Sequence, residues 1–252
     1  SICEDNKGNL WIGTFGQGLY RFNSASGRID HIKLGNNIPP PFKDYLVFSL
    51  SFDGSETIWI ASNGHQITSL NIITNEMKNY SLDQKGDVQH CFMDRNQKLW
   101  LLIMGEPLKQ IIIDANNKIT IKSYDDIRTK DFFVCPQDDN FGNLWLGTQS
   151  DGVVVFNSSL GTIKNYSLNT RDFKTLSGNQ VEDIFEDKAG NIWIATNKGV
   201  CKWSRWKKPF RHIQYDTENP NLPTGQGVSI GSSEVTGIDE DSYGNLWIST
   251  LN

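Results

Sequence analysis

Residues 186–196 read Glu186-Asp187-Lys188-Ala189-Gly190-Asn191-Ile192-Trp193-Ile194-Ala195-Thr196. Clear copies of this stretch occupy residues 4–14, 138–148 and 240–250, and two weaker copies centre on Trp59 and Trp100. A repeated segment with a period of several tens of residues indicates an architecture built from one recurring unit. The fold of the whole chain therefore follows from the structure of this repeat.

The six copies share an aspartate placed six residues before a tryptophan, with Leu or Ile on both sides of the tryptophan. The tryptophans, spaced 41–54 residues apart, are Trp11, Trp59, Trp100, Trp145, Trp193 and Trp247, and the aspartates are Asp5, Asp53, Asp94, Asp139, Asp187 and Asp241. We expect each aspartate to accept backbone N–H bonds in a turn, which every repeat needs, rather than to join a ring of metal ligands. We expect each indole to fill the space between neighbouring repeats, where it buries on the order of 200 Å².

Each repeat is interpreted as four antiparallel strands. The first ends near the aspartate, as in Val181–Phe185, and a Gly-Asn turn such as Gly190-Asn191 suits a hairpin. The second carries the tryptophan in a consecutive apolar run, which is typical of a strand covered on both faces. The third is exemplified by Gly152–Phe156, and the fourth by Lys-Asn-Tyr-Ser-Leu, found at 78–82 and again at 164–168.

These features predict an all-β fold, a β-propeller of four-stranded antiparallel blades. A WD-type propeller is disfavoured because no tryptophan is followed by aspartate, and a β-helix because its rungs are shorter than this repeat. We expect one domain over 1–252 with five complete blades and half of a sixth, and hence a fragment of a longer chain. The expected blades span 1–37, 44–84, 88–126, 131–170, 180–216 and, incomplete, 232–252.

Composition excludes several functional classes. A net charge of -5 and a pI near 5.4 leave no basic footprint for nucleic acid. No run of about 18 apolar residues is present, which argues against membrane insertion in this segment. The cysteines (Cys3, Cys91, Cys135 and Cys201) form no CxxC pair, so we interpret them as buried thiols rather than as a zinc or redox site.

The sequence offers no catalytic residue, cofactor site or metal site. The four histidines share no short metal-binding spacing, and no G-x-S-x-G motif occurs. They are His31, His65, His90 and His212. We expect His31 and His212 in fourth strands at the outer edge of their blades, and His65 and His90 in different blades. We therefore predict that the chain is not an enzyme.

The pattern Val181-x-x-Ile184-x-Glu186-Asp187-x-x-Gly190-Asn191-Ile192-Trp193-Ile194-Ala195-Thr196 resembles the two-component regulator propeller repeat. Residues 176–181 resemble the usual lead-in to its first strand. The resemblance extends over the chain, although the Trp59 copy lacks the Gly-Asn turn. The Trp100 copy lacks that turn too, and its ending reads Leu101-Leu102-Ile103-Met104.

Proteins of that family imply a specific context. Their repeats form seven-bladed propellers in the periplasmic sensor regions of hybrid two-component histidine kinases of Bacteroides-type bacteria, where they detect oligosaccharides. By this resemblance the chain is part of the ectodomain of an inner-membrane protein. Its partners are an oligosaccharide, the remainder of the sensor ectodomain and, in a dimer, a second copy.

A ligand is expected at the variable loops that join second to third strands and one blade to the next. The longest of these connections are 34–46, 169–180 and 216–234. The first candidates for sugar contacts are His65, Gln149, Asp151 and Lys198, although the ligand-binding residues as a set stay unknown. The degenerate loop Met104–Pro107 is interpreted as drift. Residues 202–212 interleave aromatic and cationic side chains that suit either a charged sugar or another protein surface, with Trp203 expected in the core.

Two alternatives to sensing are left open. The first is a scaffold or protein-interaction propeller with no small-molecule ligand. The second is a metal-dependent lyase, because streptogramin-lyase-like propellers resemble this repeat. Their chemistry needs histidines and carboxylates that face inward together, and the placement expected for the four histidines does not favour it.

Overall fold

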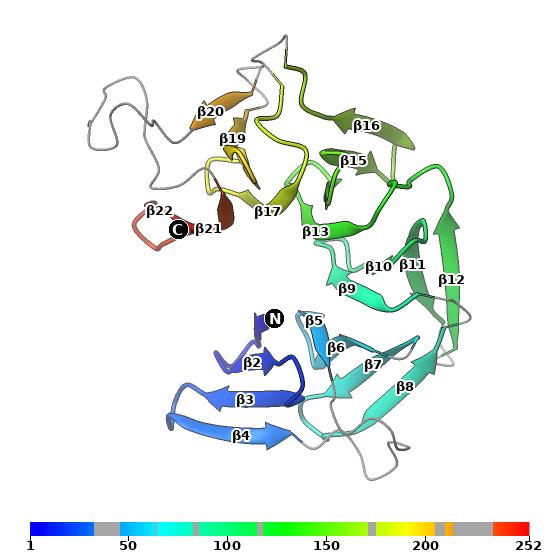
Figure 1. The fold of residues 1–252 in the computed structure, drawn as a ribbon. Helices are drawn as coiled ribbons and strands as arrows, with labels where there is room; N and C mark the ends of the chain where they lie inside the picture. Colours follow the sequence, from blue (N-terminus) through cyan, green and yellow to red (C-terminus); the bar gives the residue numbers. More distant parts are fainter. Residues whose placement is uncertain are drawn as a thin grey trace. The chain divides into compact units, whose positions relative to one another are not determined.

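The computed structural model describes residues 1–32, 46–63, 65–82, 86–114, 118–170, 175–204, 210–213 and 234–251. These residues form 22 β-strands and no helix (Figure 1). The chain divides into two compact units, Ser1–Arg128 and Thr129–Asn252.

The first unit contains three four-stranded sheets. The first sheet is β1 (Ile2–Glu4), β2 (Leu10–Gly13), β3 (Leu19–Asn23) and β4 (Arg28–Ile32). The second is β5 (Val47–Phe52), β6 (Thr57–Ser62), β7 (Gln66–Asn71) and β8 (Met77–Ser81). The third is β9 (Val88–Met93), β10 (Leu99–Ile103), β11 (Leu108–Ile113) and β12 (Ile119–Tyr124).

The second unit contains two four-stranded sheets and a hairpin. The fourth sheet is β13 (Phe133–Asp138), β14 (Asn143–Thr148), β15 (Val153–Asn157) and β16 (Thr162–Tyr166). The fifth is β17 (Val181–Glu186), β18 (Ile192–Thr196), β19 (Gly199–Trp203) and β20 (Arg211–Ile213). The hairpin is β21 (Val235–Glu240) and β22 (Leu246–Thr250).

In every sheet the strands lie in chain order and pair antiparallel, so each repeat is one blade. The fold is an all-β propeller with five complete blades and two strands of a sixth, as predicted. Within each unit the first strand of a blade packs against the first two strands of the blade before it. Thus β5 packs on β1 and β2, and β17 packs on β13 and β14.

The aspartate of each repeat holds together the turn between the first two strands. The Asp187 Oδ1 atom accepts the N–H bonds of Ala189 at 3.0 Å and Asn191 at 2.8 Å, as the sequence predicted. Its Oδ2 atom accepts a bond from Trp193 Nε1 at 2.8 Å, which the sequence analysis did not foresee. The same indole-to-carboxylate bond is made by Trp11, Trp100, Trp145 and Trp247, so five of the six repeats carry it. We call this set of bonds the Asp–Trp clamp.

A left-handed backbone conformation three residues after the aspartate lets the turn fold back onto the carboxylate. Gly190 adopts it with a φ of 75°, as expected for a glycine next to asparagine. In the Trp100 repeat Gln97 takes the same position with a φ of 60°. The Trp59 repeat is built differently, because its left-handed residue is Gly54, directly after the aspartate, with a φ of 79°.

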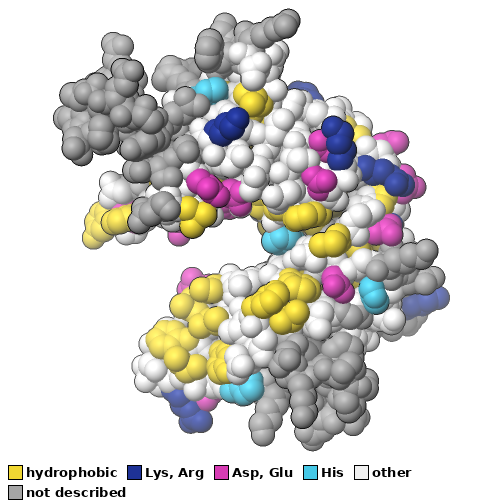
Figure 2. Space-filling model, viewed as in Figure 1, with side chains coloured by type: hydrophobic (Ala, Val, Ile, Leu, Met, Phe, Trp, Pro, Cys, Tyr) yellow, Lys and Arg dark blue, Asp and Glu magenta, His cyan; other side chains and the backbone are white. Residues whose placement is uncertain are grey.

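The tryptophans pack forward onto the next blade. Trp11 shares a buried cluster with Val47 and Leu50, and Trp193 shares one with Val235. Burial between blades is therefore confirmed for these indoles. It is wrong for Trp247, which is 66% exposed because no sheet within the described residues lies against that face of β22. Exposed hydrophobic side chains at β22 are visible in Figure 2.

A small residue two positions after the tryptophan lets adjacent blades approach closely. A Cβ atom on Gly147 would lie 2.4 Å from Cys135 Sγ and 2.7 Å from Val181 Cγ1 of the next blade. At Gly13 a Cβ would lie 2.3 Å from Val47 Cγ1. The glycine of the Trp-x-Gly-Thr ending therefore leaves room for the side chain of the first valine of the following blade.

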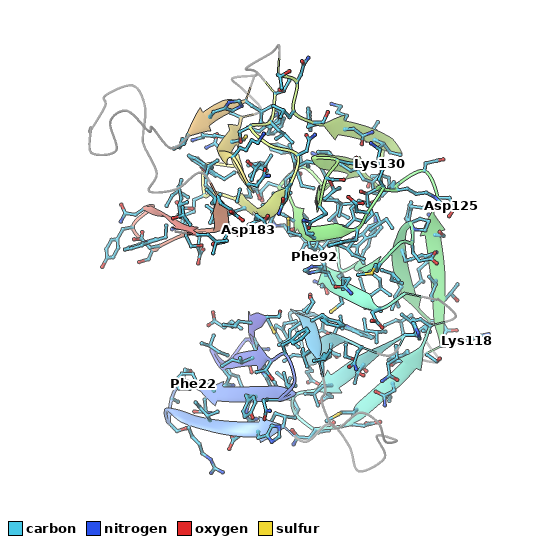
Figure 3. All side chains as sticks on the ribbon, viewed as in Figure 1. Phe22, Phe92, Lys118, Asp125, Lys130 and Asp183 are labelled. Atoms are coloured by element: carbon cyan, nitrogen blue, oxygen red, sulfur yellow. The ribbon has the colours of Figure 1, made fainter. Side chains whose placement is uncertain are left out.

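A polar contact also joins neighbouring blades in the second unit. Asp183, labelled in Figure 3, accepts the N–H of Ile238 in β21 through its Oδ2 atom at 2.9 Å. Burial raises the pKa of this carboxyl and outweighs the N–H bonds from Ile238 and Ile184, which lower it. The first strands of the fifth and sixth blades are thus joined by a hydrogen bond as well as by apolar packing.

Gly147→Ala is expected to lower the free energy of unfolding by about 1–3 kcal/mol, because the added methyl group overpacks the contact with Val181 and Cys135. The measurement is the midpoint of urea denaturation. Ser159→Ala, a surface change in the same blade, is the control and should leave the midpoint in place. An unchanged midpoint for Gly147→Ala would show that the blades are not in contact at this glycine.

Candidate functional site

The candidate residues of the second-to-third strand loops make structural contacts. His65 adopts a φ of 55°, and its Nδ1 atom lies 3.1 Å from the carbonyl oxygen of Gly86 in the connection to the next blade. Asp151 accepts bonds from the Thr129 hydroxyl and the Lys130 N–H at 3.1 and 2.8 Å. Lys130, labelled in Figure 3, also pairs with Asp151 through its Nζ atom at 3.2 Å. His65 and Asp151 therefore hold in place the connections that lead into β9 and β13.

The other two candidates lie on separate blades of the second unit. Gln149 follows β14 and donates its backbone N–H to Phe132 O at 3.2 Å, whereas Lys198 is exposed between β18 and β19. Loop residues 33–45, 171–174 and 214–233 lie outside the described part of the chain, and with them most of the three long connections. The prediction that ligands bind at this end of the sheets stays a prediction.

The described residues of the aromatic and cationic stretch 202–212 are in contact with the rest of their unit. Lys202 Nζ lies 4.5 Å from the centre of the Trp193 ring, a cation–π contact. Trp203 packs edge-on against Trp145 with ring centres 4.9 Å apart, and Phe210 packs against Tyr166. Residues 205–209 lie outside the described residues. Trp203 joins the core as predicted, and Lys202 covers an indole of its own blade.

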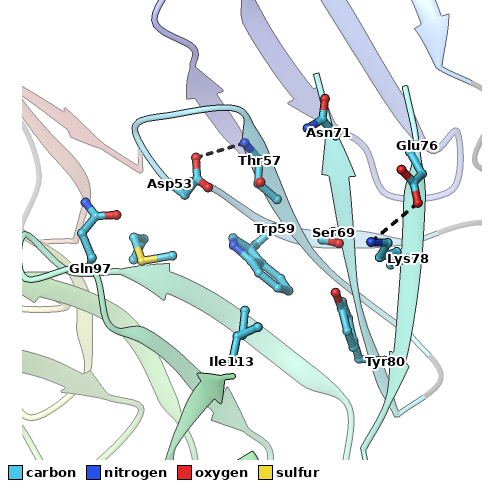
Figure 4. Close-up of a pocket in the computed structure, with 11 residues that line it drawn as sticks. Asp53, Thr57, Trp59, Ser69, Asn71, Glu76, Lys78, Tyr80, Gln97 and Ile113 are labelled. Atoms are coloured by element: carbon cyan, nitrogen blue, oxygen red, sulfur yellow. Dashed lines mark hydrogen bonds and ion pairs between the residues drawn. The ribbon is translucent and has the colours of Figure 1, made fainter. Parts of the chain in front are cut away.

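A pocket lies between the second and third blades of the first unit, toward the end of the sheets that carries the turns after the first strands (Figure 4). Its volume is about 340 Å³, at the lower end of the roughly 300–1,000 Å³ typical of small-molecule sites. We call it the Trp59 pocket. The residues that line the pocket include Asp53, Trp59, Ser69, Glu76, Lys78 and Tyr80.

The strand register explains why these side chains share one cavity. Trp59 on β6 pairs with Ser69 on β7, and Ser69 pairs with Lys78 on β8, so the three lie in one row across the sheet. Tyr80 follows Lys78 by two residues and therefore projects from the same face. Its ring centre lies 5.7 Å from that of Trp59.

The Asp–Trp clamp is open in this repeat. Four donors, the N–H groups of residues 55–57 and the Ser55 hydroxyl, bond to Asp53 Oδ1 at 2.8–3.1 Å. Trp59 Nε1 has no hydrogen-bond partner among the described residues, although the side chain is only 4% exposed. Figure 4 shows this nitrogen on the side of the indole that faces Asp53. The changed turn, with Glu56 and Thr57 at the positions of the usual Gly-Asn and the left-handed Gly54 directly after the aspartate, accompanies the loss of the bond.

The charges of the pocket come from two carboxylates and one ammonium group. Lys78 Nζ lies 3.6 Å from Glu76 Oε1, and both side chains are exposed, so the pair is weak. Burial would raise the pKa of Asp53, but the bonds from Thr57 and Ser55 outweigh burial and lower it. Asp53 is therefore ionised at neutral pH and carries the unpaired negative charge of the pocket.

A second pocket, of about 430 Å³, occupies the equivalent place between the fourth and fifth blades. Lys164 and Tyr166 line it at the positions of Lys78 and Tyr80, because both come from copies of Lys-Asn-Tyr-Ser-Leu. It differs in that Trp145 keeps its bond to Asp139 Oδ2 at 2.9 Å and Val155 stands opposite the indole. We call it the Trp145 pocket.

The residue opposite the tryptophan on the third strand differs between the blades that carry these pockets and the first and fifth blades. In the first and fifth blades this residue is Arg21 or Lys202, and its cation lies 5.7 or 4.5 Å from the centre of the indole ring. In the second and fourth blades it is Ser69 or Val155, and a pocket opens. The small or branched residue at this position was the sequence signal for both pockets.

Metal ligands and reactive thiols are not gathered in the described part of the chain. No group of three or more His, Cys, Asp or Glu side chains there is placed to hold a metal ion. All four cysteines are free, and burial raises the pKa of the Cys91 thiol to about 12. No described helix is long and apolar enough to cross a membrane.

Comparison with known families agrees with the repeat geometry. The model of the two-component regulator propeller matches residues 1–16, 175–198 and 229–252, which include the Asp–Trp clamps of the first, fifth and sixth blades. Three segments of the chain are thus similar to the two-component regulator propeller repeat. Histidine kinase P4 of Formosa agariphila is similar to this chain, with 32% identity over 97 residues, which cover 38% of this chain and 6% of that protein.

Solved structures share the fold of this chain. The extracellular domain of a protein assigned to the hybrid two-component systems of B. thetaiotaomicron superposes with a TM-score of 0.75 at 21% identity, covering 99% of this chain and 32% of that one. A catalytically inactive virginiamycin B lyase from Staphylococcus aureus superposes with a TM-score of 0.71 at 16% identity, covering 99% and 76%. The chain thus spans a small part of the histidine kinase and about a third of that extracellular domain.

The open clamp predicts a difference in stability between two equivalent substitutions. Trp145→Phe leaves the Asp139 carboxylate without its indole donor and should cost about 1–3 kcal/mol more than Trp59→Phe, in which no hydrogen bond is lost. Both variants lose similar packing area, so each is the control for the other. Urea denaturation monitored by circular dichroism measures the difference, and equal costs would show that the Trp59 clamp is closed in solution.

Proposed function

We propose that this chain is a sensor propeller in the periplasmic region of a hybrid two-component histidine kinase, and that it binds an oligosaccharide without transforming it. The match of its repeats to the two-component regulator propeller supports this proposal most directly. The similarity to a histidine kinase over 97 residues agrees with it. The rest of the parent protein is its signalling partner.

An oligosaccharide suits the side chains that line the two pockets. Sugar hydroxyls donate and accept hydrogen bonds, and the Trp59 pocket offers hydroxyl, amide, carboxylate and ammonium groups next to aromatic rings. These groups project from strands and short turns rather than from long loops, so their backbone is held in place before a ligand arrives. Preorganised polar groups of this kind favour affinity because little side-chain freedom is lost on binding.

The proposal is tested with the full protein and neutral oligosaccharides such as xylo-, manno- and gluco-oligosaccharides. A ligand present at 100 times its Kd should stabilise the folded state by about 2.7 kcal/mol, seen as a rise in Tm. The same ligand should change the autophosphorylation rate of the kinase, and chromatography should recover it unaltered.

Three results would contradict the proposal. Binding of no oligosaccharide would favour the scaffold alternative. Conversion of a bound compound into a new product would favour the lyase alternative. A bound sugar that leaves the kinase rate unchanged would remove the sensing role.

A further inference from the structure

The Trp59 pocket contains polar groups that the repeat architecture normally pairs. In the other five repeats the aspartate accepts the indole N–H, whereas Trp59 Nε1 has no partner among the described residues. The residue as a whole is 4% exposed, and its nitrogen lies on the side of the indole that faces Asp53 (Figure 4). This N–H is therefore a donor that a water molecule or a ligand in the pocket can use.

Two hydroxyl groups in the same pocket are also available. The Tyr80 and Ser69 hydroxyls line the cavity and form no hydrogen bond within the described structure. The third blade shows the paired arrangement, in which Tyr124 donates to Gln110 Oε1 at 2.9 Å. Gln110 occupies the position of Ser69 opposite the tryptophan, and the serine is too short to make that bond.

We propose that the Trp59 pocket binds one neutral pyranose unit of an oligosaccharide, with adjacent ring hydroxyls accepting from Trp59 Nε1–H and donating to the Asp53 carboxylate. This inference rests on the oligosaccharide-sensing function proposed above. A hydroxyl group suits either partner because it can accept from the indole N–H or donate to the carboxylate. Two neighbouring ring hydroxyls, one on Trp59 and one on Asp53, would stand in the place where other repeats have a direct bond.

The charge and size of the pocket favour a neutral ring. Glu76 and Lys78 carry opposite charges, so the ionised Asp53 makes the pocket negative overall, which disfavours uronic acids and sulfated sugars. Tyr80 presents a partly exposed aromatic ring for the C–H groups of the sugar. A volume of about 340 Å³ suits one unit of a longer chain that continues into solvent.

The Trp145 pocket provides a contrast within the same chain. There the indole N–H is bonded to Asp139, and Val155 replaces the serine hydroxyl. Its lining includes the apolar side chains of Phe141 and Leu160, and its charged group is Lys164. The two pockets share a lysine and a tyrosine, so these two residues alone cannot account for a difference in sugar binding between the pockets.

The test measures binding of cellobiose, xylobiose, mannobiose and digalacturonic acid to the full protein by isothermal titration calorimetry. For a neutral disaccharide that binds, Asp53→Asn and Trp59→Phe should each weaken affinity about tenfold or more, since the first removes a charged acceptor and the second removes the indole donor. Tyr80→Phe should weaken it by a few fold. The matched Tyr166→Phe should leave it unchanged, and circular dichroism shows whether each variant is folded.

The possible failures can be told apart. If a neutral disaccharide binds and regulates the kinase but Asp53→Asn and Trp59→Phe bind it as tightly as the natural protein, the site assignment is wrong and the proposed function stands. If only digalacturonic acid binds, the neutral specificity is wrong. If none of the panel binds, the pocket assignment falls together with oligosaccharide sensing.

Discussion

A carboxylate that accepts two turn N–H bonds and one indole N–H bond is the interaction on which this architecture depends. In the fifth blade Asp187 makes all three, to Ala189, Asn191 and Trp193. The bond fixes the rotamer of the tryptophan, and the tryptophan then presents its apolar surface to the next blade. The local geometry of one turn therefore determines how two sheets pack.

The close approach of neighbouring blades follows from the same short motif. Gly147 leaves room for Val181, which belongs to the next repeat, and Gly13 does the same for Val47.

The proposed binding site lies in the repeat that departs from this regular pattern. A changed turn at Gly54 and a serine opposite Trp59 leave an aspartate, an indole N–H and two hydroxyls facing one cavity. A scaffold that normally pairs such groups internally thereby acquires groups that can bind something else.

The strands, the blade count and the role of the aspartate in the turn could be predicted because they depend on local pattern. The bond between Asp187 and Trp193 could not, because a six-residue spacing does not state how the turn folds back. The pocket escaped prediction because Trp59, Ser69 and Lys78 meet only through strand register. The prediction that Trp203 lies in the core is confirmed. The contact of Lys202 with the Trp193 ring could not be predicted, because it depends on which residue of the neighbouring strand lies opposite the tryptophan.

At Trp247 the indole still bonds to its aspartate, at 3.1 Å, although most of the ring is in contact with solvent. This hairpin keeps its shape without a sheet covering the indole, and a loop this short closes at little cost in chain entropy. The other face of the hairpin packs on the fifth blade, where Val235 and Ile238 share a buried cluster with Trp193. Repeat arrays in which each unit contacts only its neighbours can begin to fold at any unit, so we expect a defect in one turn to delay its own blade and the blade beside it more than the others.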